Sequence, residues 1–140
     1  NNTFWNDTEP TTSVISIGTN NRVNGSSKNH VCYAWHSVEG YSSFGTFEGN
    51  GNADGPFIYT GFRPRFIATK STDASGAAWL RWYIKDLASD IDETVLYPNY
   101  LYATPSYDNV DVFHDGFKIK SNDDTRINGN GVVFFYWAIA

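Results

Sequence analysis

The 140-residue chain has no methionine, a single cysteine and few basic residues, and the last two shortages each exclude a class of protein. One cysteine cannot form an intramolecular disulfide, so no disulfide framework holds the fold. Ten Lys and Arg against fifteen Asp and Glu give a net charge of −5. Such a chain has little with which to neutralise the phosphates of nucleic acids or of anionic lipids. We therefore expect no nucleic-acid partner.

Long apolar runs and helix-forming stretches are also missing. The longest apolar run covers residues 132–140, which is much shorter than a membrane-spanning helix of about 20 residues. No stretch repeats Ala, Leu, Glu and Lys at helical spacing. We expect no membrane insertion and very little helix.

Aromatic residues make up 17% of the chain, and twelve glycines accompany them. Aromatic residues suit a half-buried sheet surface, and glycine suits turns. The pattern predicts about nine short strands separated by turns, near residues 14–17, 31–38, 44–47, 57–60, 66–70, 79–84, 110–113, 117–120 and 132–140. We predict an all-β fold, an antiparallel β-sandwich of jelly-roll type, with a closed β-barrel as the alternative.

Two of these segments carry more detailed expectations. Residues 31–38 are apolar with one polar interruption, so we predict a buried strand in which Cys32 is a small core residue and not a reactive thiol. Residues 110–120 alternate around Asp115-Gly116, which predicts a tight β-hairpin.

The predicted domain covers residues 14–140, after a polar arm formed by residues 1–13. Within it, Arg22-Val23-Asn24-Gly25 is echoed by Arg126-Ile127-Asn128-Gly129, and each precedes an apolar run. The echo and the strand-like run up to Ala140 favour one unit of a larger or tandem protein. The alternative is that two strands require the same kind of turn.

The usual catalytic patterns are missing. The chain has no Gly-x-Ser-x-Gly elbow and no glycine-rich phosphate loop, and its three histidines, His30, His36 and His114, lack metal-ligand spacing. Paired carboxylates, as in glycosidases, are the remaining enzymatic hypothesis. The acidic residues near predicted strands are Glu39, Glu48, Asp86 and Asp111, and the sequence does not show that any two converge. We expect a protein that is not an enzyme and has no cofactor.

Two sets of residues are candidates for binding. Asn50, Asn52 and Asp54 place oxygen ligands at alternate positions of a loop, which suits calcium, although such loops are usually simple turns. Exposed aromatic rings can pack against the C–H groups of a sugar. The aromatic candidates for ligand binding are Trp79, Trp82, Tyr100, Tyr102 and Tyr107, and the alternative for them is packing in the core or against a neighbouring subunit.

Several motifs occur in a familiar order along most of the chain. They are Ala34-Trp35-His36-Ser37-Val38-Glu39-Gly40-Tyr41-Ser42-Ser43-Phe44-Gly45, Gly49-Asn50-Gly51, Asp54-Gly55-Pro56-Phe57, Tyr59-Thr60-Gly61-Phe62-Arg63-Pro64, Asp115-Gly116-Phe117-Lys118 and Tyr136-Trp137-Ala138-Ile139-Ala140. In these motifs the chain resembles a domain of unknown function found in tailed-phage virion proteins, often tail-fibre or other surface proteins of marine phages. The resemblance supplies no catalytic residues.

The resemblance implies a virion structural or host-recognition role. We expect a module of tail-fibre or adhesin type at the virion surface, an extracellular location, that assembles with other virion protein copies as a homo-oligomer and contacts a host glycan. The first alternative is a structural decoration or fibre-shaft domain without a ligand. The second alternative is a carbohydrate-active enzyme.

Overall fold

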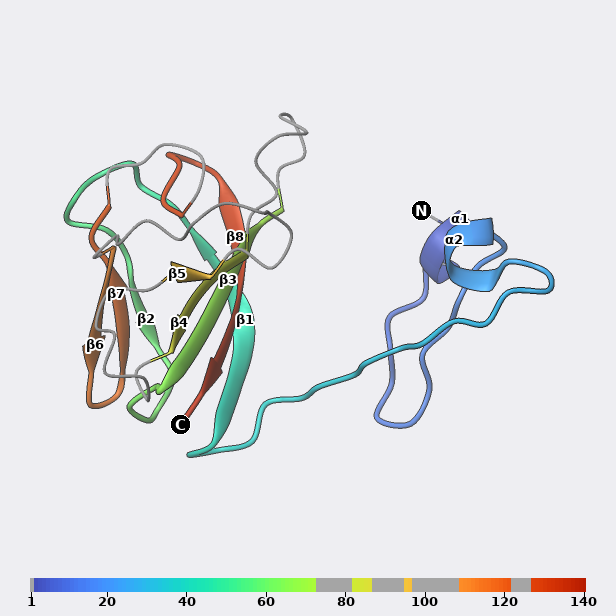
Figure 1. Cartoon of the computed structure of the whole chain (residues 1–140), viewed down its shortest axis with the longest axis horizontal. Coiled ribbons are helices and arrows are strands. Elements are labelled where there is room, and N and C mark those ends of the chain that lie inside the picture. Colours follow the sequence, from blue (N-terminus) through green and yellow to red (C-terminus); the bar gives the residue numbers. More distant parts are fainter. Residues whose placement is uncertain (1, 73–81, 87–94, 97–108, 122–126) are drawn as a thin grey trace. The chain divides into compact units, whose positions relative to one another are not determined.

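The computed structural model describes residues 2–72, 82–86, 95–96, 109–121 and 127–140 (Figure 1). The chain divides into two compact units, Asn1–Trp35 and His36–Ala140. All eight strands of the described residues belong to the second unit.

The first unit contains two single-turn helices, α1 (Asn2–Trp5) and α2 (Asn21–Asn24). Asn20 caps α2, because its side-chain oxygen accepts a hydrogen bond from the backbone N–H of Arg22 at 2.9 Å. The strand expected at residues 14–17 is wrong: this segment forms no strand with any of the described residues, and Val14 is 58% exposed. β-branched residues favour a strand only where a partner strand is available.

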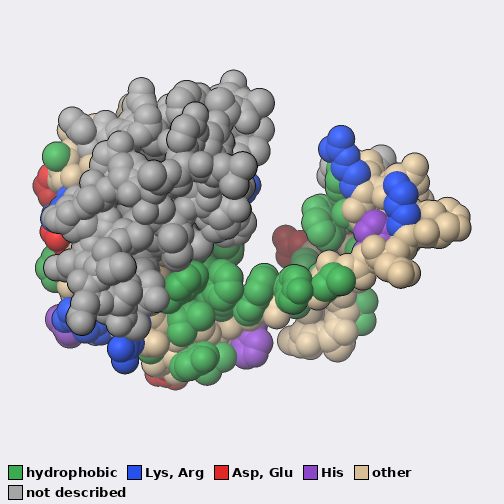
Figure 2. All heavy atoms as spheres, viewed as in Figure 1, with side chains coloured by type: hydrophobic (Ala, Val, Ile, Leu, Met, Phe, Trp, Pro, Cys, Tyr) green, Lys and Arg blue, Asp and Glu red, His purple; other side chains and the backbone are tan. Residues whose placement is uncertain are grey.

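The buried strand expected at residues 31–38 is also wrong. The segment is extended and exposed, with Val31 78% and Tyr33 73% exposed, and its hydrophobic side chains are visible in Figure 2. Cys32 is exposed as well, so the prediction of a core cysteine fails. Only Val38 makes a β-bridge, to Ser42. An apolar run shows that a segment can form a strand, but it does not show that the fold provides a neighbour for it.

The second unit contains a five-stranded antiparallel sheet in the order β1-β8-β3-β4-β5. Its strands are β1 (Ser42–Glu48), β8 (Val133–Ile139), β3 (Phe66–Ser71), β4 (Trp82–Asp86) and β5 (Val95–Leu96). Strand β8 lies between β1 and β3, so Ile139 pairs with Ser42 on one side and with Phe66 on the other. The strands predicted at residues 66–70 and 132–140 are therefore confirmed.

A three-stranded antiparallel sheet has the order β2-β7-β6. Its strands are β2 (Phe57–Tyr59), β7 (Gly116–Ile119) and β6 (Val110–Phe113). The predicted hairpin between β6 and β7 is confirmed, although its turn is one residue earlier than expected. Because Phe113 pairs with Gly116, the two-residue turn is His114-Asp115.

The core lies between the two sheets. Phe117 of β7 meets Tyr136 of β8 edge to face, with ring centroids 5.8 Å apart, and Ile67 and Val110 are fully buried in the same cluster. Each such side chain contributes about 1.5–3 kcal/mol through its burial. The described residues thus form two small antiparallel sheets that pack like a sandwich, with almost no helix. They do not close into a barrel, so that alternative is wrong.

Candidate functional site

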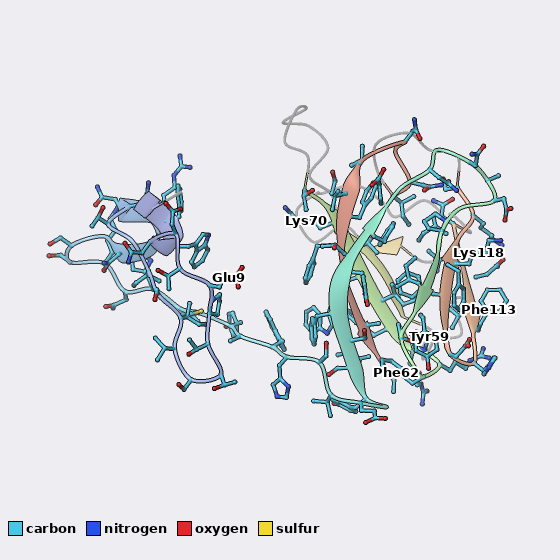
Figure 3. All side chains as sticks on the ribbon, turned by 180° about the vertical axis from the view of Figure 1, so that it is seen from behind. Glu9, Tyr59, Phe62, Lys70, Phe113 and Lys118 are labelled. Atoms are coloured by element: carbon cyan, nitrogen blue, oxygen red, sulfur yellow. The ribbon has the colours of Figure 1, made fainter. Side chains whose placement is uncertain are left out.

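Three aromatic side chains point away from the core on the three-stranded sheet. Successive residues of a strand face opposite sides, so buried Ile58 in β2 leaves its neighbours Phe57 and Tyr59 facing outward. They are 48% and 68% exposed, and Phe113 of β6 is 42% exposed. We call Phe57, Tyr59 and Phe113 the aromatic platform. Figure 3 labels Tyr59 and Phe113 on this sheet, with Lys118 beside them.

The pairing register brings the platform together around a glycine. Gly116 of the central strand β7 pairs with Tyr59 on one side and with Phe113 on the other. A Cβ atom at Gly116 would collide with the carbonyl oxygen of Ile58 and would lie 2.8 Å from Cζ of Phe57. The Phe57 ring therefore occupies space that a side chain at position 116 would fill. It meets the Phe113 ring edge to face, with the ring centroids 5.8 Å apart.

Tyr59 is held where two turns meet. The backbone N–H groups of Thr60 and Gly61 both donate to the carbonyl oxygen of Asp115, at 2.9 and 3.1 Å. These bonds join the end of β2 to the β6–β7 turn. Gly61 has a φ of 80°, which glycine adopts without strain, and the hydroxyl oxygen of Tyr59 lies 3.7 Å from where its Cβ would be. Tyr59, the most exposed residue of the platform, is therefore followed by backbone that these two hydrogen bonds hold in place.

Two lysine–carboxylate pairs border the platform. Lys118 pairs with Asp54, and Nζ of Lys120 lies 2.9 Å from Oδ1 of Asp111. Lys118 is the β7 partner of Phe57 on one side and of Asp111 on the other. The hydrogen bond from Lys118, and then its positive charge, lowers the pKa of Asp54 below its usual value. Figure 2 shows acidic and basic side chains side by side on the β6–β7 side of the unit.

Asp54 reaches Lys118 because its loop is fastened to a buried amide. Asn128 is fully buried. Its Nδ2 donates to the carbonyl oxygens of Ser121 and Asn52 and to Oδ1 of Asn50, at 2.7, 2.8 and 3.0 Å. Its Oδ1 accepts from the backbone N–H of Asn50 at 2.9 Å. We call these contacts the Asn128 network.

Two of the three side chains proposed as calcium ligands, Asn50 and Asp54, already have partners for their oxygens inside the protein. Oδ1 of Asn50 accepts from the backbone N–H of Asn52 and from Asn128, each at 3.0 Å, while Asp54 pairs with Lys118. A calcium ion would have to replace these interactions. In the described part of the chain no group of three or more His, Cys, Asp or Glu side chains could hold a metal ion. Calcium at this loop stays a prediction.

The aromatic candidates from the sequence cannot be placed in the same way. Trp79, Tyr100, Tyr102 and Tyr107 lie outside the described residues, and of Trp82 only the backbone, in β4, is described. Sequence reasoning missed the platform. The alternation of Phe57-Ile58-Tyr59 was the available signal, because it places two aromatic rings on one face and an aliphatic side chain on the other.

Within the described residues, no helix is both long enough and apolar enough to cross a membrane. No curated protein and no solved structure matches the chain. A family model matches residues 1–140 over their whole length. On that match, the protein belongs to the DUF7483 family, a domain of unknown function.

Proposed function

We propose that this domain is a non-catalytic attachment module at the surface of a phage virion, of tail-fibre or adhesin type, and that it attaches through the aromatic platform. The carrying observation is that Phe57, Tyr59 and Phe113 are exposed together on one sheet face. Single exposed aromatic residues are ordinary, but a contiguous group on a surface is typical of a binding site. The sequence resemblance to tailed-phage surface proteins supports the location, which is extracellular.

The chemistry at the platform favours binding over catalysis. A glycosidase needs one carboxyl group that stays protonated near neutral pH, which requires a raised pKa. The pKa of Asp54 is lowered instead, and Asp111 is paired with Lys120. The Asp54 carboxylate is therefore suited to accept hydrogen bonds from a ligand and not to donate a proton to it, and Oδ1 of Asp111 is held by Lys120. These features support a module that is not an enzyme, and the expectation of no cofactor stays a prediction.

The strand pairing supports the jelly-roll type as part of this proposal. The first strand β1 pairs with the last strand β8, and the second strand β2 pairs with β7. A chain that is doubled back on itself and then rolled pairs its strands in this way. We further propose that the module assembles with other copies of itself into a homo-oligomer at the virion surface.

Cell adsorption tests the proposal. Fluorescently labelled domain is mixed with a panel of bacterial strains, and cell-bound fluorescence is measured. We expect the wild type to adsorb to at least one strain, and the Tyr59→Ala/Phe113→Ala variant to lose adsorption. Tyr41→Ala is the matched control, because Tyr41 is 59% exposed in the same unit but outside the platform. It should adsorb like the wild type.

The possible results separate the alternatives. Equal adsorption of all three proteins would contradict attachment through the platform. If the wild type adsorbs to no strain, the ligand-free decoration or fibre-shaft role takes precedence. Circular dichroism spectra of each variant confirm that the fold is retained before adsorption is compared.

A further inference from the structure

We infer that the ligand of the aromatic platform is a neutral oligosaccharide, bound with the C–H face of a pyranose ring against Phe57, Tyr59 and Phe113. This inference rests on the proposed function and names its ligand class. The argument has three steps, which concern the size of the platform, the groups on its border and its charge.

The size of the platform favours a small ligand over a protein. A fully exposed aromatic side chain offers about 150–250 Å². At exposures of 48%, 68% and 42%, the three rings together offer on the order of 300 Å². Each partner in a stable protein complex buries about 800 Å². The platform is therefore too small to be a protein interface by itself, whereas it can cover one face of one or two sugar rings.

The border of the platform carries the groups that a sugar needs. A pyranose has an apolar C–H face and a rim of hydroxyl groups, each of which donates and accepts hydrogen bonds. The Asp54 side chain is 87% exposed and that of Asp111 is 48% exposed, so their carboxylate oxygens can accept from hydroxyl groups. The ammonium group of Lys118 can donate to one. The Phe57 and Phe113 rings are inclined by 70°, so a flat sugar face would stack on one of them and meet the edge of the other, and the charged pairs would fix its orientation.

The charge of the border favours a neutral sugar. Each lysine beside the platform is balanced by a carboxylate, Lys118 by Asp54 and Lys120 by Asp111. No surplus positive charge is therefore available from these pairs to attract sulfated, phosphorylated or uronic-acid polymers. The net charge of −5 for the chain also repels such polymers at long range. A neutral hexose chain meets neither obstacle.

An oligosaccharide array tests the inference. The purified domain is applied to neutral gluco-, galacto- and manno-oligosaccharides beside sialylated and uronic-acid oligosaccharides, and the best binder is titrated by calorimetry. We expect binding to at least one neutral sugar, weakened about tenfold or more by Tyr59→Ala, because a lost ring contact of about 1.4 kcal/mol corresponds to a factor of ten. Tyr41→Ala should bind within about twofold of the wild type, and raising the salt from about 0.05 to 0.5 M should change the affinity little.

Several results would overturn the inference. Binding only to acidic oligosaccharides with a steep salt dependence would do so, and so would binding to no sugar, or equal binding by Tyr59→Ala and the wild type. Cells treated with periodate, which cleaves vicinal diols of sugars, distinguish this failure from failure of the proposed function. If adsorption requires the platform but survives periodate and is lost after protease treatment, the attachment function stands and the ligand is a protein. If adsorption is lost after periodate, the sugar is supported.

Discussion

The sequences Arg22-Val23-Asn24-Gly25 and Arg126-Ile127-Asn128-Gly129 differ by one methylene group, and the structure uses them in different ways. Asn24 ends the helical turn α2 and is exposed, and its Nδ2 donates to the carbonyl oxygen of Gly18 at 3.1 Å. Asn128 is fully buried and takes part in four hydrogen bonds that hold the loop beside the platform. The described residues of the pattern, Val23-Asn24-Gly25 and Ile127-Asn128-Gly129, therefore have two local conformations and two roles.

The difference continues into the apolar segments that follow. After Asn24-Gly25, residues 31–35 are extended and exposed. After Asn128-Gly129, the chain forms β8, which has a partner strand on each side. An Asn-Gly turn and an apolar run permit a strand, but the neighbours β1 and β3 decide that it forms. The similarity of residues 22–25 to residues 126–129 does not by itself show that the chain contains two copies of one structural unit.

The largest expected effect is on the Asn128 network. Asn128→Ala would leave the buried carbonyl oxygen of Ser121 without this donor. It would also break the part-buried bonds to Asn50 and Asn52. A buried unsatisfied group alone costs about 1–3 kcal/mol. We expect a loss of about 4 kcal/mol in the free energy of unfolding, measured with urea. Asn24→Ala removes one part-buried hydrogen bond and should cost about 1 kcal/mol or less. Equal losses at the two positions would mean that the two turns are more alike than they are in this structure.

An intermediate effect is expected at the residues just before the two asparagines. Ile127 is 1% exposed and belongs to the core cluster, so Ile127→Ala should lower the free energy of unfolding by about 3 kcal/mol. Val23 is only half-buried, and Val23→Ala should cost about 1 kcal/mol or less. Thermal melts of the two variants measure both. If the Val23 variant were as unstable as the Ile127 variant, Val23 would have to be as deeply buried as Ile127, contrary to this structure.

The smallest effect is expected at the ion pair carried by the loop of the Asn128 network. The folded-state pKa of Asp54 is lowered by Lys118, so this pair stabilises the fold above the usual aspartate pKa of about 4. That contribution is lost as the pH falls through the lower, folded-state pKa. The urea midpoint of the wild type should therefore decrease slightly more between about pH 7 and pH 3 than that of Asp54→Asn. Identical decreases would show that the pair is too exposed to matter.

Local pattern was sufficient for several strands. The alternation and turns around residues 57–60, 66–70 and 110–120 predicted β2, β3 and the β6–β7 hairpin, because side-chain period and turn chemistry are local properties. Burial of residues 31–38 could not be predicted correctly from the same signals. Whether an apolar run is covered depends on segments that are distant in the sequence.

The candidate site was less predictable than the fold. Phe57 and Phe113 meet only because β2 and β6 both pair with β7, and no property of either strand alone indicates that arrangement. The space for the Phe57 ring depends on Gly116, which the sequence suggested only as a turn residue. In the sequence, Asn128 was notable only as part of the repeated Arg-x-Asn-Gly pattern. Its burial and its contacts with Asn50 and Asn52 depend on residues far away in the sequence, so the pattern could not predict them.

The central position of β8 has a consequence for the order of folding. Ser43 in β1 and Tyr136 in β8 are 93 positions apart in the sequence, and their hydroxyl groups are 3.0 Å apart. Strand β8 lies between β1 and β3 and follows both of them in the sequence. The five-stranded sheet therefore cannot form until β8 has been synthesised and inserted between them. Closing so long a loop is slow, which favours a folding rate set by the arrival of β8. Until then, β1 and β3 each expose an unpaired strand edge, and this stage of folding is the one most prone to aggregation with other chains.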